Sequence, residues 1–247
     1  MGLGILTWRQ STIYTDPVTY WRAAIAGNPN SPETWNNLSA NLLETGQVDE
    51  ATALLRKTLE LAPTNAVARY NLGSALMRAG QVDGAIAAYQ KVIEIKPDHA
   101  DAHCNLAIGL HQKGQIDQAI VHYQRALAIR PEFAEVHNNL GRVYQDKGQV
   151  NEAIAHYRRA LEIQPGLSQT HFNLASLLQQ SGAADQAIAH YQRAIEMRPD
   201  YAEAHNNLGR LLHEQGRLNE AAAHFRRGLE LQLQPNGRTP ARSRAGY

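Results

Sequence analysis

Six asparagines recur at one constant interval along the chain, and their side chains are the leading candidates for chemistry. They are Asn37, Asn71, Asn105, Asn139, Asn173 and Asn207. Each amide carries both a hydrogen-bond donor and an acceptor, so it can pair with the N–H and C=O of a peptide group. Asparagine is a poor helix former, so six copies in expected helices need a reason. A row of such amides would hold an extended backbone without reading its sequence. Alternatively, each amide bonds to a neighbouring carbonyl within the chain.

Four more polar residues accompany this asparagine ladder and are candidates for the same binding face. They are Asn138, Asn206, Arg142 and Arg210. Acidic residues such as Glu135 and Glu203 open the same segments, so the face has mixed charge. The whole chain has 24 Lys and Arg against 23 Asp and Glu, a formal net charge of +1. This balance argues against a nucleic-acid partner and favours a protein or peptide ligand.

The eleven histidines suggest a metal site, but their spacing argues against one. One ladder is His103, His137, His171 and His205, and the other is His122, His156, His190 and His224. Neighbours within a ladder are one repeat apart, about 10 Å or more when helices pack side by side. Zinc ligands lie only about 2.0–2.3 Å from the metal. We therefore expect half-buried or solvated histidines and no metal or cofactor.

No sequence feature predicts catalysis, and no catalytic residue is assigned. Phosphate-binding glycine loops are absent from the sequence, and the single cysteine, Cys104, allows no intramolecular disulfide. Hydrophobic residues make up 43% and charged residues 19%, as in globular chains, whereas only 6% are aromatic, which disfavours an all-β fold. The apolar start, residues 1–8, is far shorter than the roughly 20 residues of a membrane span.

The elements that position these residues repeat at the same interval as the asparagines. Pro29, Gly46 and Ala51 each start a series that continues at this interval to Pro199, Gly216 and Ala221. Within residues 134–167, apolar residues at helical spacing predict two helices separated by a turn at Gly148. The second helix of each unit is expected to be capped by an Asp or Asn. These residues are Asp49, Asp83, Asp117, Asn151, Asp185 and Asn219.

The chain resembles the tetratricopeptide repeat family, with its fullest match at Leu140, Gly141 and Tyr144, followed by Gly148, Ala153, Tyr157, Ala160 and Pro165. The resemblance implies an all-α, right-handed superhelical solenoid of antiparallel helix pairs, whose first helices line a concave groove. It also implies six repeats. Their bounds are residues 32–65, 66–99, 100–133, 134–167, 168–201 and 202–235. Residues 1–31 would contain a capping half repeat, and residues 236–247 would be a disordered tail.

Three functions fit these patterns. The first is a non-catalytic scaffold that binds an extended peptide segment through the asparagine ladder. The second is a substrate-recognition arm or fragment of a larger glycosyltransferase, because the ladder is similar to that of O-linked GlcNAc transferase. Residues 6–10 and 20–22 are similar to the junction between membrane span and repeats in transmembrane mannosyltransferases. The third is a weak homodimer through residues 219–233, where an apolar stripe has no following repeat. A cytoplasmic location is expected.

Overall fold

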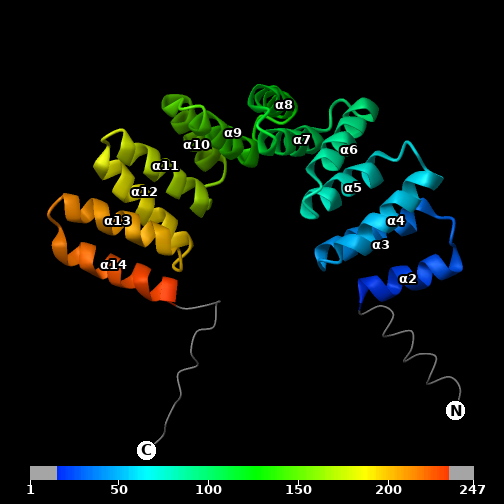
Figure 1. The fold of residues 1–247 in the computed structure, drawn as a ribbon, viewed down its shortest axis with the longest axis horizontal. Coiled ribbons are helices and arrows are strands. Elements are labelled where there is room, and N and C mark those ends of the chain that lie inside the picture. Colours follow the sequence, from blue (N-terminus) through cyan, green and yellow to red (C-terminus); the bar gives the residue numbers. More distant parts are fainter. Residues whose placement is uncertain (1–15, 234–247) are drawn as a thin grey trace, which may run out of the picture. The chain divides into compact units, whose positions relative to one another are not determined.

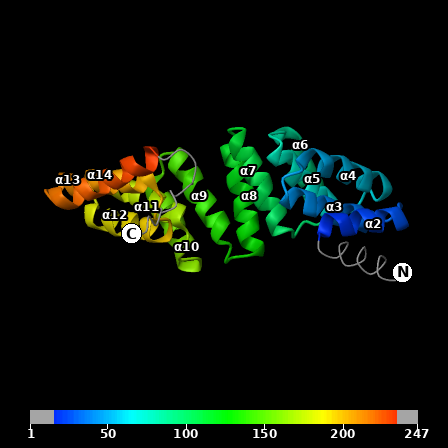
Figure 2. The same cartoon turned by 90° about the horizontal axis from the view of Figure 1, so that it is seen from below.

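The computed structural model describes residues 16–233, and within them every regular element is an α-helix (Figures 1 and 2). The thirteen helices are α2 (Pro17–Gly27), α3 (Pro32–Glu44), α4 (Val48–Leu61), α5 (Ala66–Arg78), α6 (Val82–Ile95), α7 (Ala100–Gln112), α8 (Ile116–Ile129), α9 (Ala134–Asp146), α10 (Val150–Ile163), α11 (Ser168–Gln180), α12 (Ala184–Met197), α13 (Ala202–Glu214) and α14 (Leu218–Leu233). From α3 onward they form six consecutive pairs, which confirms the predicted all-α solenoid of antiparallel helix pairs. The predicted tail, residues 236–247, and residues 6–10 of the proposed membrane junction lie outside the described residues.

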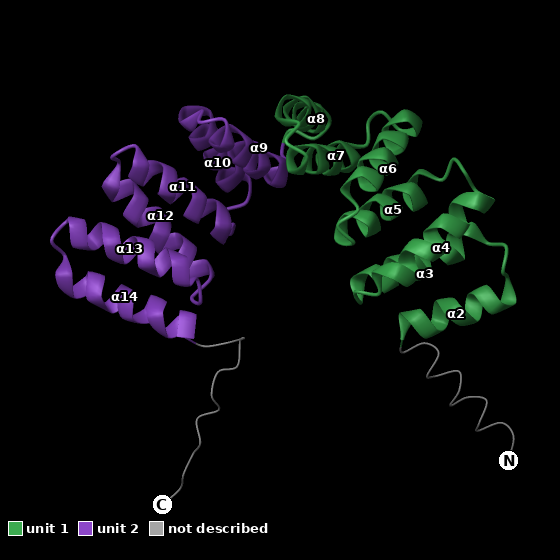
Figure 3. Cartoon of the chain, viewed as in Figure 1, with its two compact units in different colours: residues 1–131 green, residues 132–247 purple. Residues whose placement is uncertain are grey.

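The pairs fall into two compact units, shown in two colours in Figure 3. The first unit ends at Pro131 and contains α2 to α8, and the second begins at Glu132 and contains α9 to α14. Within each unit, a helix packs most closely on its partner in the pair and next most closely on the first helix of the following pair. The core therefore runs along each unit between successive helices.

The predicted glycine turns are confirmed. The six turn glycines, from Gly46 to Gly216, have φ between +71° and +81°, a conformation that glycine adopts without steric cost. At Gly148 the chain reverses so tightly that Gln149 N–H donates to Tyr144 O over 2.8 Å. Each such turn brings the second helix back along the first.

The predicted caps of the second helices are wrong. These helices begin one residue before the expected cap, at Val48 in α4 and Val150 in α10. From α4 to α12, the residues that precede them make no side-chain capping bond. Two of these acidic side chains instead contact the next pair: Lys113 Nζ lies 2.9 Å from Asp83 Oδ1, and Gln215 Nε2 donates to Asp185 Oδ1 over 3.0 Å.

Close helix contact within a pair depends on small residues opposite large ones. Tyr157 of α10 is fully buried against Gly141 of α9, where an added Cβ would lie only 2.6 Å from the tyrosine ring. Ala153, one turn earlier on α10, is also fully buried. The side of α10 that carries Ala155 is exposed. The space between α9 and α10 is therefore already filled.

We predict that Ala153→Leu lowers the free energy of unfolding by about 1–3 kcal/mol, because three extra carbons must enter this filled space. Urea denaturation followed by circular dichroism measures the change. Ala155→Leu is the matched control, since the same substitution on the exposed side of α10 adds no buried volume. Equal stability of the two variants would show that Ala153 does not lie at a helix contact.

Candidate functional site

The asparagine ladder lies on the first helix of each pair: α3, α5 and α7 in the first unit, and α9, α11 and α13 in the second. All six side chains are half-buried. Each first helix is packed on its pair partner, so the position of each amide is fixed by the repeat. Half-burial leaves an amide partly open to a ligand while allowing bonds within the chain.

Ladder amides in the first unit link successive first helices. Asn71 Nδ2 donates to Asn36 Oδ1 over 3.0 Å, and Asn105 Nδ2 donates to the Tyr70 hydroxyl over 2.9 Å. Asn105 also bonds to the buried Tyr89 hydroxyl, whose pKa burial raises to about 12. These amides thus bond to side chains of the preceding repeat, which supports the alternative that the ladder serves the array itself.

The second unit repeats this arrangement around two buried tyrosines. The Tyr157 hydroxyl donates to Gln145 Oε1 over 3.0 Å and also bonds to Asn173 of the next first helix. Tyr191 makes the equivalent bonds to Gln179, over 3.0 Å, and to Asn207. Burial raises the pKa of both hydroxyls, so they stay protonated and can donate.

Between α9 and α11 lies a polar recess of about 370 Å³. We call it the amide recess; its lining is Asn138, Arg142, Gln145, Asp146, Gln169 and Asn173. It brings together three of the predicted residues, Asn138, Arg142 and Asn173. Sequence reasoning missed Gln145, Asp146 and Gln169. Gln145 carried a usable signal, because Gln179 stands at the same position of the next repeat.

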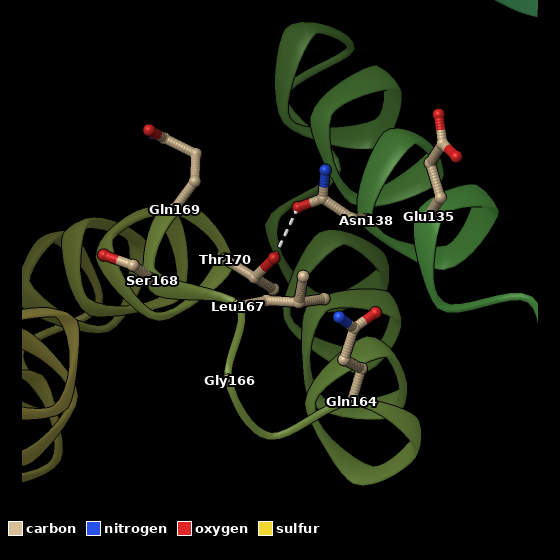
Figure 4. A pocket seen from close by; sticks show the side chains of 8 residues that line it. All are labelled: Glu135, Asn138, Gln164, Gly166, Leu167, Ser168, Gln169 and Thr170. Carbon is tan, nitrogen blue, oxygen red and sulfur yellow. Dashed lines mark hydrogen bonds between the residues drawn. The ribbon is translucent and has the colours of Figure 1, made fainter. Parts of the chain in front are cut away.

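A second recess of about 450 Å³ lies at the start of α11 (Figure 4). Its lining is Glu135, Asn138, Gln164, Gly166, Leu167, Ser168, Gln169 and Thr170. Thr170 Oγ1 donates to Asn138 Oδ1 over 2.8 Å, and this bond is drawn in Figure 4. Asn138 and Gln169 line both recesses, so they form a shared wall.

Other predicted residues are placed elsewhere. Arg210 Nη2 donates to Asn207 Oδ1 over 3.3 Å on the exposed side of α13. Asn206 turns toward α14, where its amide fills the space beside Gly228. Asn37 and Asn139 are half-buried on α3 and α9, and neither lines the two recesses above. The structure therefore gathers three predicted residues in one site and spreads the others along the two units.

The two histidine ladders, treated as separate in the sequence, meet within the helix pairs. His103 of α7 lies beside His122 of α8, with their Nδ1 atoms 3.1 Å apart. His103 is buried, and His122 is half-buried. The same offset along the chain separates the members of all four pairs and was an available signal. Among residues 16–233, no three histidine, cysteine or acidic side chains gather as a metal site would require.

Comparison with known proteins identifies the repeat. Four family models match, three described as tetratricopeptide repeat, at residues 42–107, 132–200 and 172–237, and one described as TPR repeat, at residues 109–148. No curated protein sequence matches the chain. Among residues 16–233, no helix combines the length and apolar character that a membrane crossing requires.

Solved structures with the same fold include pilF of Pseudomonas aeruginosa, with 21% identity, a TM-score of 0.75, and coverage of 85% of this chain and 95% of that one. YrrB, described as a TPR protein with an unusual peptide-binding site, has 22% identity, a TM-score of 0.59, and coverage of 74% and 95%. The APC/C hetero-tetramer Cut9–Hcn1 has 19% identity and a TM-score of 0.73. There the match covers 92% of this chain but only 44% of the other.

We predict that Tyr157→Phe lowers the free energy of unfolding by about 1 kcal/mol, because the hydroxyl bonds to Gln145 and Asn173 are lost. Urea denaturation measures this loss. Tyr144→Phe, the same change on a half-buried tyrosine of α9, is the control and should have a smaller effect. A Tyr157→Phe protein as stable as the parent would show that the Tyr157 hydroxyl does not tie α11 to the preceding helix pair.

Proposed function

Because the chain belongs to the tetratricopeptide repeat family, we propose that it binds an extended peptide segment of a partner protein along its first helices. The role is non-catalytic. The amide recess carries this proposal, because it is a hollow lined mainly by groups that match a peptide backbone. The peptide-binding site named for YrrB supports the same use of the fold.

The amides of the recess can bond to the array and to a ligand together. Thr170 uses one lone pair of Asn138 Oδ1, whereas an asparagine amide can make up to four hydrogen bonds. Asn173 accepts from Gln169 Nε2 over 3.0 Å and thereby presents a fixed orientation. Amides held in place in this way lose little conformational freedom when a peptide binds.

The charge of the amide recess favours a peptide over a polyanion. Arg142 and Asp146 both line it, so cationic and anionic groups oppose each other. A nucleic-acid groove would instead collect Lys and Arg along the phosphate path. We therefore propose a protein or peptide ligand and no nucleic acid. The cytoplasmic location stays a prediction.

The alternative function, a substrate-recognition arm of a larger glycosyltransferase, uses the same contacts. In that case the bound segment would be part of an acceptor protein. The presence of ladder asparagines on all six first helices favours this alternative as well. Identification of a partner copurified from the native host would separate the two functions.

We also propose the division into six repeats between residues 32 and 235, preceded by a half repeat that contains α2. The contact of α2 with the first repeat supports this register. Arg22 Nη2 donates to Glu50 Oε1 over 2.8 Å, from α2 to the second helix of the first repeat. Arg158 Nη2 donates to Gln186 Oε1 over 3.2 Å at the same offset along the chain, between second helices of successive repeats.

We predict that changing Asn105, Asn139 and Asn173 together to Ala weakens peptide binding by on the order of 1 kcal/mol for each lost contact. A peptide selected from a random library on the parent protein, titrated by calorimetry, provides the measurement. Circular dichroism checks that helix content is unchanged.

The control for this variant makes the same chemical change on second helices. Asn151 and Asn219 are exposed at the starts of α10 and α14, so their replacement by Ala should leave the affinity unchanged. If the ladder variant bound the peptide as tightly as the parent, the ladder would have no part in recognition.

A second proposal concerns association through α14. Tyr191 of α12 is fully buried, whereas Phe225, its counterpart in the next repeat on α14, is 40% exposed. Leu229 and Leu233 continue the stripe and are 55% and 71% exposed. An apolar stripe of this kind typically marks an interaction surface. We propose that it pairs with the same stripe of a second copy about a two-fold axis, which closes the assembly.

We predict that Leu229→Glu converts the weak dimer to a monomer, because it places two carboxylates in an apolar interface. Sedimentation velocity over a concentration series measures the mass. Phe225 is less suitable for this test because its ring packs on Gly209 of α13. Gln232→Glu on the same helix is the control. A parent protein that remains monomeric at its highest concentration would contradict pairing.

A further inference from the structure

In each of four successive repeats, a pair of histidines joins the first helix to the second. The pairs are His103–His122, His137–His156, His171–His190 and His205–His224, with Nδ1 atoms 3.1, 3.1, 2.9 and 2.9 Å apart. They link α7 to α8, α9 to α10, α11 to α12 and α13 to α14. The proposed peptide site does not use them, and their function is independent of what that site binds.

Each pair is held by an in-plane hydrogen bond. The ring centroids lie 5.2–5.3 Å apart. This distance equals the separation of the two Nδ1 atoms plus the distance from centroid to nitrogen within each ring. The two nitrogens therefore lie on the line between the rings, as in an N–H···N bond. A metal ion on that line would need about 4 Å between the nitrogens, since each metal–nitrogen bond is about 2.0–2.1 Å. The pairs are thus hydrogen bonds and not metal sites.

A backbone carbonyl decides where the protons lie. His103 Nε2 is 3.1 Å from Pro97 O, and His171 Nε2 is 3.0 Å from Pro165 O. A carbonyl oxygen only accepts, so Nε2 carries the hydrogen and Nδ1 of the same neutral ring is an acceptor. The Nδ1–H of the partner, His122 or His190, must then be the donor.

This assignment makes the pair sensitive to a second proton. The first added proton enters Nε2 of the partner ring on the second helix and leaves the N–H···N bond intact. The second must enter Nδ1 of His103, where it would face the N–H of His122. The bond is then lost, and two cations lie close together within one helix pair. The two rings titrate as a coupled pair.

The charged side chains around the pairs mostly oppose protonation. The cations that act on them are Arg125 at His103, Arg158 at His190, Arg193 at His171 and Arg227 at His205. His99 also acts on His103 and opposes its protonation. Two carboxylates act in the other direction, Glu196 at His171 and Glu220 at His224. The balance therefore disfavours a doubly charged pair.

The first two helix pairs make the same carbonyl contact without histidine. Trp35 Nε1 donates to Pro29 O over 2.9 Å, and Arg69 Nη2 donates to Pro63 O over 2.6 Å. The positions that correspond to the partner histidine hold Leu54 and Ala88. These pairs thus keep the link to the proline carbonyl with side chains that do not change charge between pH 5 and 8.

We propose that the four histidine pairs make α7 to α14 an acid-sensitive part of the array, in which uptake of protons separates the two helices of each pair. The pairs α3–α4 and α5–α6 keep their stability in the same pH range. As the pH falls, the last four helix pairs would thereby lose their order while the first two stay folded.

The direction of the pH effect follows from the pKa values. Burial is the main cause that lowers the pKa of His103, His122 and His171. It lowers the pKa of His190 to about 4. The unfolded chain, with an ordinary pKa of about 6.5, binds protons that the folded pair does not. Stability is therefore complete above pH 6.5 and falls as the pH drops from 6.5 toward 4.

Hydrogen–deuterium exchange with mass spectrometry at pH 7 and pH 5 tests the proposal segment by segment, using protection factors corrected for the intrinsic exchange rate. We expect the equilibrium constant for local opening of α11 and α12 to rise roughly 20-fold from pH 7 to pH 5 for each histidine whose pKa in the folded protein stays near 4. Helices α3 and α4 contain no histidine and should change little.

The chain itself offers the matched variant. His171→Trp with His190→Leu reproduces the Trp35 and Leu54 combination of the first pair. It should abolish the pH dependence of α11 and α12 while α13 and α14 keep theirs. If this variant misfolds, His171→Arg with His190→Ala reproduces the second pair and takes its place. Equal loss of protection in α3–α4 and α11–α12 of the parent, or pH dependence retained in the folded variant, would overturn the proposal.

Discussion

The array depends on a buried tyrosine in each of its four inner repeats: Tyr89, Tyr123, Tyr157 and Tyr191. The Tyr157 ring fills the space above Gly141 and so fixes the distance between α9 and α10. Its hydroxyl bonds to Gln145 of the same pair and to Asn173 of the next. One side chain thus sets the packing within a pair and the placement of the following helix. Tyr89 and Tyr191 do the same in their repeats.

This dependence gives the asparagine ladder two roles that support each other. An amide that bonds to a buried tyrosine is held in one orientation, and a ligand then meets a row of oriented donors and acceptors. Asn173 shows both aspects, because it bonds to Tyr157 and also lines the amide recess. Recognition and repeat stacking therefore draw on the same side chains. A substitution in the ladder should be assessed for both.

The fold follows from the sequence because its signals are local and periodic. Gly148 ends a helix, and Ala153 allows close contact, whatever the rest of the chain does. The caps were mispredicted because the glycine turn delivers Gln149 N–H to Tyr144 O, so α10 starts at Val150 and not after Asn151. Contacts across a helix pair, such as His171 with His190, depend on how far one helix is shifted along the other. The constant offset between the two histidine ladders indicates that they share a repeat, but only the packed helices show that the rings of His171 and His190 touch.

The carbonyl of the proline that ends a repeat has a further consequence. Trp35, Arg69 and His103 differ in size, shape and charge, yet each places a nitrogen against the carbonyl of the proline that precedes its helix. The position therefore requires a side-chain N–H group that lies within hydrogen-bond distance of the proline carbonyl, and it does not require a particular amino acid. A repeat of this kind can therefore diverge in sequence at this position while its hydrogen bond to the proline carbonyl is kept.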